Sequence, residues 1–302
     1  MNTKRVLLLI ASLGAASALS AQSVQFIVLD RQVNYVQTAA GSAGLAGATP
    51  YEFVIDLNGT GLTAPPFTFT FKKPGDPDTV YASYEQDTGK EWQAPLSGLG
   101  DFSSMASLHS VFPAGTYTIQ TNLGNTSALS ISNLIGSPND GFGNTPFVIG
   151  TQDGNPVTWA GNKMLVDPTK QLTLTTTTFT TNNSSSDNRI GLWLGGYMFS
   201  DDVTNETAPN TFVFSGTSVE MQIAANMLYA GSTYNGGLEF NVVDGALVDL
   251  TTPFGSGANG VAVYTAFTSF SIQAIPEPSA YAAIFGAMVL AGVVMGRRRR
   301  AC

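Results

Sequence analysis

The stretch "PFTFTFKK", residues 66–73, places three phenylalanines, Phe67, Phe69 and Phe71, at alternate positions with threonines between them. Successive side chains of a β-strand point to opposite faces of the sheet, so a period of two indicates a strand with one apolar and one polar face. Lysines follow at the end of the stretch, where the apolar pattern stops. The stretch therefore predicts a half-buried strand.

The same alternation recurs along the chain. It is found in "TYTIQTNL" (116–123), "QLTLTTTTFT" (171–180), "TFVFSG" (211–216) and "GVAVYTAF" (260–267). Turn signals rich in Gly, Pro, Asn and Asp lie between these runs, among them "LNGTG" (57–61), "KKPGDPD" (72–78), "SPNDGFGN" (137–144) and "TQDGNP" (151–156). Many short strands separated by such turns predict an all-β fold, specifically an antiparallel β-sandwich-like domain, in which a jelly roll and an Ig-like sandwich cannot be distinguished.

Helical periodicity is confined to one short candidate, "VEMQIAANMLYAG" (219–231), and even there Val219, Met221 and Ile223 alternate. There is no internal repeat of fixed period, which argues against a propeller or a solenoid. We therefore expect one β domain over residues 22–275. A division at the polar, linker-like stretch 180–189 is the alternative.

Charge limits the class of partner. The chain has 302 residues, 43% of them hydrophobic and 11% charged, which is typical of a folded protein, and its formal net charge is -8. Six of the 13 basic residues lie at the two ends, so residues 22–275 alone carry a net charge of -13. Nucleic-acid binding depends on Lys and Arg that neutralise phosphates, so nucleic acid is not an expected partner.

Catalytic chemistry has few candidate residues. Cys302 is the single cysteine and His109 the single histidine, which excludes an intramolecular disulfide, a Cys/His zinc site and a Cys–His nucleophile pair. No G-x-S-x-G motif is present. Glu220 and Glu239 are carboxylates in apolar strand contexts, but an acidic chain contains such pairs by chance. We expect no catalytic residues and no enzymatic activity.

The N-terminus reads "MNTKRVLLLIASLGAASALSAQ" (1–22), with Lys4 and Arg5 before an apolar run of about eleven residues and a small-residue segment. That order is typical of a secretory signal peptide, and the run is too short to span a bilayer. We expect a signal peptide over residues 1–21, removed by signal peptidase. The cut follows one of three residues: Ala18, Ser20 or Ala21.

The C-terminus, residues 276–302, combines three features. Pro276, Glu277 and Pro278 precede an uncharged apolar segment, 279–296, which as a helix would be about 27 Å long. That length is just enough to cross a membrane. Four arginines follow at once: Arg297, Arg298, Arg299 and Arg300. Arginine clusters stop translocation, so this segment predicts a transmembrane helix with the body outside the cytoplasmic membrane.

This ending resembles the C-terminal sorting signal of bacterial PEP-CTERM proteins. The resemblance is limited to residues 276–302 and to the accompanying signal peptide. It implies cleavage near Pro276–Pro278 by an exosortase-like membrane protease, after which the body is found at the cell surface or in the extracellular matrix, commonly with exopolysaccharide. A simple tail-anchored membrane protein is the alternative, in which the C-terminal helix persists in the mature form.

Two kinds of ligand site remain open within the body. Asp56 and Asn58 in "DLNGTG", with Asp201 and Asp202 in "FSDDVTNE", offer oxygen ligands for calcium, although neither stretch has a full loop signature and hairpin turns explain the same residues. No other cofactor is expected. Trp92, which has polar neighbours, is a possible glycan platform, whereas Trp193 in "GLWLGGYMF" is expected to be buried on both sides.

These features together predict a non-enzymatic secreted protein of the cell surface or extracellular matrix that is associated with exopolysaccharide. The alternative is an extracellular glycan-binding or glycan-cleaving module that carries the same sorting signal.

Overall fold

The computed structural model describes residues 23–60, 69–76, 80–81, 85–87, 91–95, 102–121, 126–131, 144–180, 189–195, 211–214, 217–249 and 259–275. The predicted signal peptide, the C-terminal sorting segment 276–302 and residues 181–188 of the linker-like stretch lie outside these ranges. Within them, no helix combines the length and the hydropathy that a membrane crossing needs.

The described elements are almost all strands. The first half of the chain contains β1 (Ser23–Ala39), β2 (Ser42–Leu45), β3 (Tyr51–Thr60), β4 (Phe69–Lys72), β5 (Val80–Tyr81), β6 (Glu85–Asp87), β7 (Glu91–Pro95), α2 (Met105–Val111), β8 (Gly115–Thr121) and β9 (Thr126–Ile131). The second half contains β10 (Val148–Gln152), β11 (Asn155–Pro156), β12 (Thr158–Ala160), β13 (Lys163–Val166), β14 (Leu172–Thr176), β15 (Arg189–Leu194), β16 (Thr211–Phe214), β17 (Glu220–Ile223), β18 (Thr233–Asp249) and β19 (Asn259–Ala274). The all-β prediction is confirmed.

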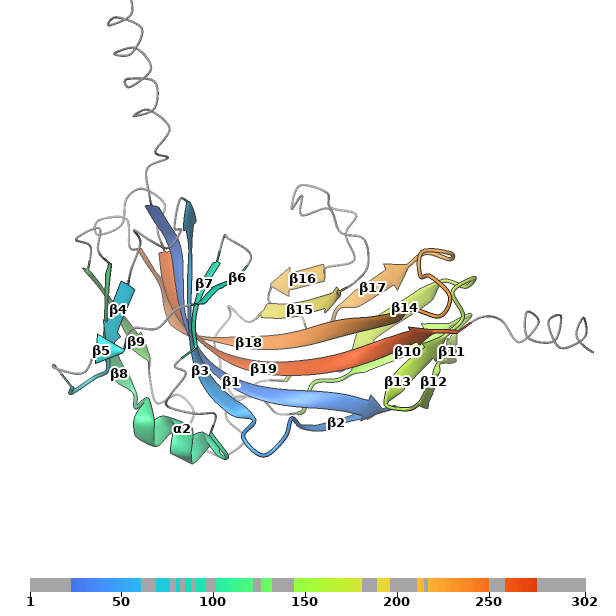
Figure 1. The fold of residues 1–302 in the computed structure, drawn as a ribbon, viewed down its shortest axis with the longest axis horizontal. Helices are drawn as coiled ribbons and strands as arrows, with labels where there is room; N and C mark the ends of the chain where they lie inside the picture. Colours follow the sequence, from blue (N-terminus) through green and yellow to red (C-terminus); the bar gives the residue numbers. More distant parts are fainter. Residues whose placement is uncertain are drawn as a thin grey trace, which may run out of the picture.

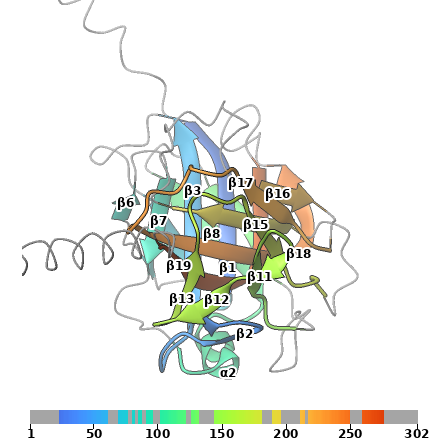
Figure 2. The ribbon, with the colours of Figure 1, turned by 90° about the vertical axis from the view of Figure 1, so that its right-hand side faces the viewer.

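One large sheet organises the molecule. Its order is β16-β15-β18-β19-β1-β3-β7-β6, with β2 added to β1 and β13 added to β19. The long strands β1, β18 and β19 bend near their middle, so the sheet is curved (Figure 1). In the end view, β12 and β13 lie beside the C-terminal ends of β1 and β19 (Figure 2). Two smaller sheets, β5-β4-β8-β9 and β11-β10-β14-β17, complete the fold.

Both small sheets pack against the same face of the large one. Near the start of β3, Phe53 lies 6.3 Å from Phe71 and 5.6 Å from Tyr117, ring centroid to centroid, so β4 and β8 cover that half. In the other half Phe240 of β18 lies 4.6 Å from Phe179. The buried apolar side chains from all three sheets form one cluster. The arrangement is therefore sandwich-like, with two covering sheets side by side on one curved sheet.

The strand pairing is mixed: most pairs are antiparallel, as predicted, but two are parallel. β1 pairs with β19 in parallel over Phe26–Val36, and β13 pairs with β19 in parallel as well. Antiparallel neighbours can be joined by a hairpin, whereas a parallel pair needs a long crossover. Here nearly the whole body forms the crossover between β1 and β19. Local patterns in a sequence do not contain that long-range pairing.

A short helix, α2, was not predicted. Ser104 caps it: the Ser104 hydroxyl accepts from the Ser107 backbone N–H, and the Ser107 hydroxyl accepts in return from the Ser104 N–H. This reciprocal pair satisfies two backbone donors that a helix start leaves free. Met105 and Leu108 are the buried residues of the helix. The capping signal is present in "SSMAS", but seven residues are too few to produce a recognisable period.

One predicted turn is part of a strand, the stretch with both helical and strand signals is a strand, and one turn is as predicted. "LNGTG" is not a turn: β3 continues to Thr60, paired with β1 and β7. Residues 219–231 hold β17 and turns, which agrees with the alternation rather than with a helix. "TQDGNP" is the predicted turn, a two-residue hairpin in which Asp153 and Gly154 have φ of 50° and 75°. Positive φ at both positions matches the right-handed twist of paired strands, and Asp-Gly is suited to it.

Candidate functional site

The face of the large sheet turned away from the two small sheets is polar and lies on the inside of the bend. We call it the concave face. Across the four central strands, Gln32 is aligned with Glu52 and Thr265, and Asn34 with Phe267, which is aligned in turn with Glu239. The described side chains of this face that enter the site are Gln32, Asn34, Glu52, Trp193, Glu239, Phe267 and Ser269. Asn241 and Thr265 lie on the same face but are buried, and the Thr265 hydroxyl donates to Asn241 Oδ1 at 2.6 Å. Residues between them on the same strands face the apolar core.

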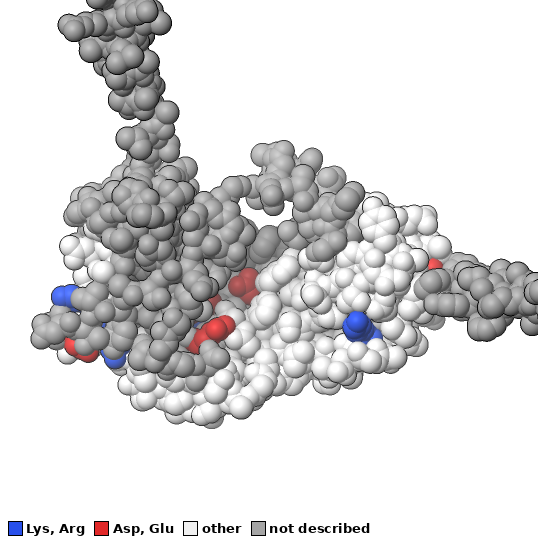
Figure 3. Space-filling view, in the orientation of Figure 1, with Lys and Arg blue, Asp and Glu red and all other residues white. Residues whose placement is uncertain are grey.

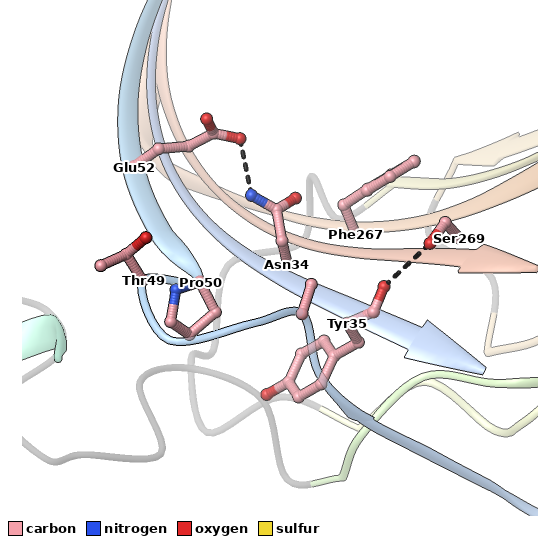
Figure 4. A pocket seen from close by; sticks show the side chains of 8 residues that line it. Asn34, Tyr35, Thr49, Pro50, Glu52, Phe267 and Ser269 are labelled. Carbon is pink, nitrogen blue, oxygen red and sulfur yellow. Dashed lines mark hydrogen bonds between the residues drawn. The ribbon is translucent and has the colours of Figure 1, made fainter. Parts of the chain in front are cut away.

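Glu52 is the centre of a hydrogen-bonded group on this face (Figure 4). One carboxylate oxygen, Oε1, accepts from Gln32 Nε2 at 2.8 Å and from Asn34 Nδ2 at 2.7 Å. Gln32 Nε2 also donates to Asn34 Oδ1 at 2.6 Å. Among the described residues no donor reaches the second oxygen, Oε2. The three side chains thus hold one another in place and leave acceptor capacity for a ligand.

An aromatic pair lies beside this group. Trp193 of β15 and Phe267 of β19 stack with ring centroids 5.6 Å apart and planes 24° apart. Both rings are half-buried, while Leu192 and Leu194 are fully buried on the opposite face. The expectation that Trp193 is buried on both sides is therefore wrong, because strand alternation exposes every second residue of "GLWLG" to the concave face.

A glycine lets the two rings meet. Gly237 of β18 is aligned with Trp193 on one side and with Ser269 on the other. A Cβ atom at Gly237 would lie 2.5 Å from Trp193 Cε2 and 2.8 Å from Phe267 Cε2, closer than side-chain atoms normally approach. Aromatic rings that cover a strand glycine replace the missing side-chain contacts. The absence of a side chain at Gly237 therefore leaves the space that the two rings occupy.

A pocket of about 300 Å³ opens where the aromatic pair and the Glu52 group meet. Asn34, Glu52, Phe267 and Ser269 line it from the sheet, and Tyr35, Ala46, Thr49 and Pro50 line it from β1 and the loop after β2. This volume is at the lower end of the range usual for small-molecule sites, which combine apolar surface with a few placed polar groups.

The site is acidic. Glu52 and Glu239 supply carboxylates, and the space-filling view shows acidic side chains gathered in the hollow at the bend (Figure 3). Among the described side chains of this face, the nearest cation along β19 is Lys163 at the far end, where its Nζ donates to Thr233 Oγ1 at 3.1 Å. Within the described ranges no group of three His, Cys, Asp or Glu side chains could hold a metal ion. The geometry is suited to accepting hydrogen bonds from a neutral, hydroxyl-rich ligand.

The residues singled out from the sequence do not come together here. Trp92 lies on β7, aligned with Leu57 and Gln86. Asp56 and Asn58 lie within β3, aligned with Gln93 and Glu91, and not in the turn where calcium was considered. Asp201, Asp202 and the sorting-signal residues 276–278 and 297–300 lie outside the described residues. The site residues that sequence reasoning missed are Gln32, Asn34, Glu52, Gly237 and Phe267.

Arg31 occupies the other face of β1 and is only 1% exposed. Its guanidinium donates to the Tyr264 hydroxyl and, at 2.7 Å, to the Phe112 carbonyl oxygen. Burial also raises the pKa of the neighbouring Tyr117 phenol. His109 of α2 contacts Tyr264 edge-on, and its Nε2 is buried with no hydrogen-bond partner among the described residues. These side chains fasten α2 to the sheet.

His109 makes stability depend on pH. Burial, followed by the positive charge of Arg31, lowers the pKa of His109 from 6.5 to about 4. The unfolded chain therefore binds a proton near pH 6.5 that the folded chain binds only near pH 4, so stability falls as pH decreases through this window. We expect the parent to lose about 1 kcal/mol more than His109→Gln between pH 7 and pH 5, after discounting for solvent screening at a half-buried group.

Urea denaturation at pH 7, 6 and 5 measures this difference, with parent and variant compared at each pH so that carboxylate titration cancels. Parallel pH profiles for the two proteins would contradict the assignment.

No family model matches the chain, and no curated protein matches it. One solved structure with some likeness is the crystal structure of DIP-gamma IG1+IG2, at 10% sequence identity over 79% of this chain and 94% of that chain, with a TM-score of 0.19. At that TM-score the likeness carries no argument about ligand or activity.

Proposed function

We propose that the protein is a non-enzymatic, exported β protein of the cell surface or extracellular matrix, sorted by its C-terminal PEP-CTERM-like segment. The observation that carries the proposal is the order of features in the sequence: an export signal, Pro276–Pro278, an uncharged segment of 18 residues, and Arg297–Arg300. The all-β body, with its acidic charge and without internal cysteine, is compatible with that setting.

Each part of the segment has a physical role in this proposal. Proline fixes φ and lacks a backbone N–H, so the Pro276-Glu277-Pro278 triplet stays out of the following helix and accessible to a membrane protease. The apolar helix and the arginines hold the triplet at the outer face of the membrane. Cleavage by an exosortase-like enzyme would then release the body or transfer it to another surface component.

The proposal predicts that changing Pro276, Glu277 and Pro278 together to alanine abolishes maturation. Alanine favours helix, so the apolar helix would extend through the triplet and remove the recognition element. Intact mass spectrometry of membrane, surface and medium fractions measures this. We expect the parent mass to end near Pro276–Pro278 and the variant to retain the C-terminus in the membrane.

The alternative of a permanent tail anchor predicts that the parent itself keeps Arg297 to Cys302 in the membrane fraction. A control variant, Ser279→Ala, alters the chain just beyond the triplet and should mature like the parent. A triple variant that matures and localises normally would overturn the sorting proposal.

A glycan-binding role in that setting is favoured over a glycan-cleaving one by the concave face. Retaining and inverting glycosidases need two carboxyl groups facing each other across the scissile bond. Glu220 and Glu239, the two strand carboxylates considered from the sequence, lie on different sheets. Glu52 and Glu239 share the concave face, but two strands separate β3 from β18, which places them three strand spacings, about 14 Å, apart. That is more than the roughly 5–9.5 Å between the carboxyl groups of glycosidases.

A further inference from the structure

We infer that the concave face binds a neutral polysaccharide, with Trp193 and Phe267 as the stacking platform and Glu52, Gln32 and Asn34 as the hydrogen-bonding group. The inference deepens the proposed function, because an extracellular setting is where such a ligand would be met. It names a different site from the Trp92 platform expected from the sequence.

The platform has the chemistry that sugar rings require. A pyranose has an apolar C–H face, which packs on an aromatic ring, and a rim of hydroxyl groups, which need polar partners. Trp193 and Phe267 are half-buried and stack on each other with planes 24° apart, so the ring surface that the partner ring leaves uncovered is what they offer to a sugar. Aromatic side chains of this kind combine large contact area with little conformational entropy to lose on binding.

The polar partners lie next to that surface. Phe267 belongs both to the aromatic pair and to the wall of the 300 Å³ pocket, whose other walls include Asn34, Glu52 and Ser269. Glu52 Oε1 is fixed by two amide donors at 2.7 and 2.8 Å, which orients Oε2 without further ordering. A carboxylate that accepts from a hydroxyl makes a charge-assisted hydrogen bond, about twice as strong as a neutral one.

Charge selects among polysaccharides. Polymers of uronic acids or sulfated sugars are anionic and would be repelled by the Glu52 carboxylate, while Lys163 at the far end of β19 donates to Thr233. Neutral hexose polymers carry no such penalty. The strand is also long enough for a chain ligand: the half-buried side chains along β19 from Phe267 to Gln273 cover six residue steps, roughly 20 Å at about 3.3 Å per residue.

The test is affinity electrophoresis of the protein recovered from the producing cells through native gels containing one polysaccharide each. The neutral probes are hydroxyethyl cellulose, dextran and a galactomannan, and the anionic probe is alginate. We expect retardation by at least one neutral probe and none by alginate. Dissociation constants follow from retardation against probe concentration.

The variants localise the binding. Trp193→Ala should weaken affinity for the retarding probe at least tenfold, and Glu52→Gln several-fold, because glutamine keeps the shape but loses the charge. Tyr229→Ala is the matched control: Tyr229 is a 62% exposed aromatic in the turn region after β17, outside the concave face, and its loss should leave affinity unchanged. Far-UV circular dichroism and the unfolding midpoint check that each variant is folded.

Several results would overturn the inference. These are no retardation by any neutral probe, equal retardation by alginate, or full affinity in folded Trp193→Ala. Each is independent of the sorting proposal, because binding is measured on purified protein whether or not its C-terminus has been processed. Conversely, normal maturation of the Pro276–Pro278 variant would overturn the sorting proposal and leave the binding result standing.

Discussion

Replacing Phe112 by alanine is expected to lower the free energy of unfolding by about 3–5 kcal/mol, the usual cost of deleting a buried phenylalanine ring. Phe112 is fully buried. Its ring stacks on Phe53 with centroids 4.3 Å apart and planes 5° apart, and meets Phe102 edge-on at 6.0 Å. The deletion would therefore leave a cavity where α2, β3 and β8 meet.

Chemical denaturation followed by tryptophan fluorescence measures this loss. Ser103→Ala, at an exposed position just before the helix cap, is the control and should change stability by less than about 0.5 kcal/mol. A loss of under about 1 kcal/mol for Phe112→Ala would mean that this aromatic cluster does not hold the small sheet to the large one.

The period of two was sufficient to predict the class of fold. Phe71, Tyr117 with Ile119, and Leu172 with Leu174 are all buried on the faces that alternation assigns to them. Such patterns depend only on neighbours in the sequence, which is why they are readable. The parallel pairing of β1 with β19 joins residues more than 200 positions apart and has no local signature. Capped helix α2 is local but too short to show a period.

The candidate site was not predictable because both faces of its strands carry apolar residues. Alternation alone then does not tell which face is buried and which is exposed to a ligand. In "GVAVYTAF" the apolar residues Val263 and Phe267 belong to the concave face, while Tyr264 and Ala266, between them, are buried against the covering sheets. The opposite assignment was the natural one. Likewise Glu52 gains its partners Gln32 and Asn34 only through the β1–β3 register.

The second prediction concerns Gly236 and Gly237, neighbouring glycines of β18. Each is covered by an aromatic ring, and the two rings lie on opposite faces of the sheet. Gly236 faces the core, where a Cβ atom would lie 2.6 Å from Phe270 Cε2 and 2.7 Å from Phe270 Cε1. Phe270 is only 2% exposed and has no room to move. Gly236→Ala is therefore expected to cost about 1–3 kcal/mol, the typical cost of overpacking a filled core.

Gly237→Ala adds the same atom on the concave side and should behave differently. There the obstructing ring is that of half-buried Trp193, which can turn toward solvent, so we expect a loss of under about 1 kcal/mol. The stacking with Phe267 would be broken instead, which near-UV circular dichroism detects. If the two alanines proved equally costly, or Gly237→Ala left the aromatic signal intact, the ring placement would be wrong. If Gly236→Ala proves the more costly of the two, the core face of β18 is the one that matters for stability. Gly237→Ala should then remain folded but bind polysaccharide as poorly as Trp193→Ala.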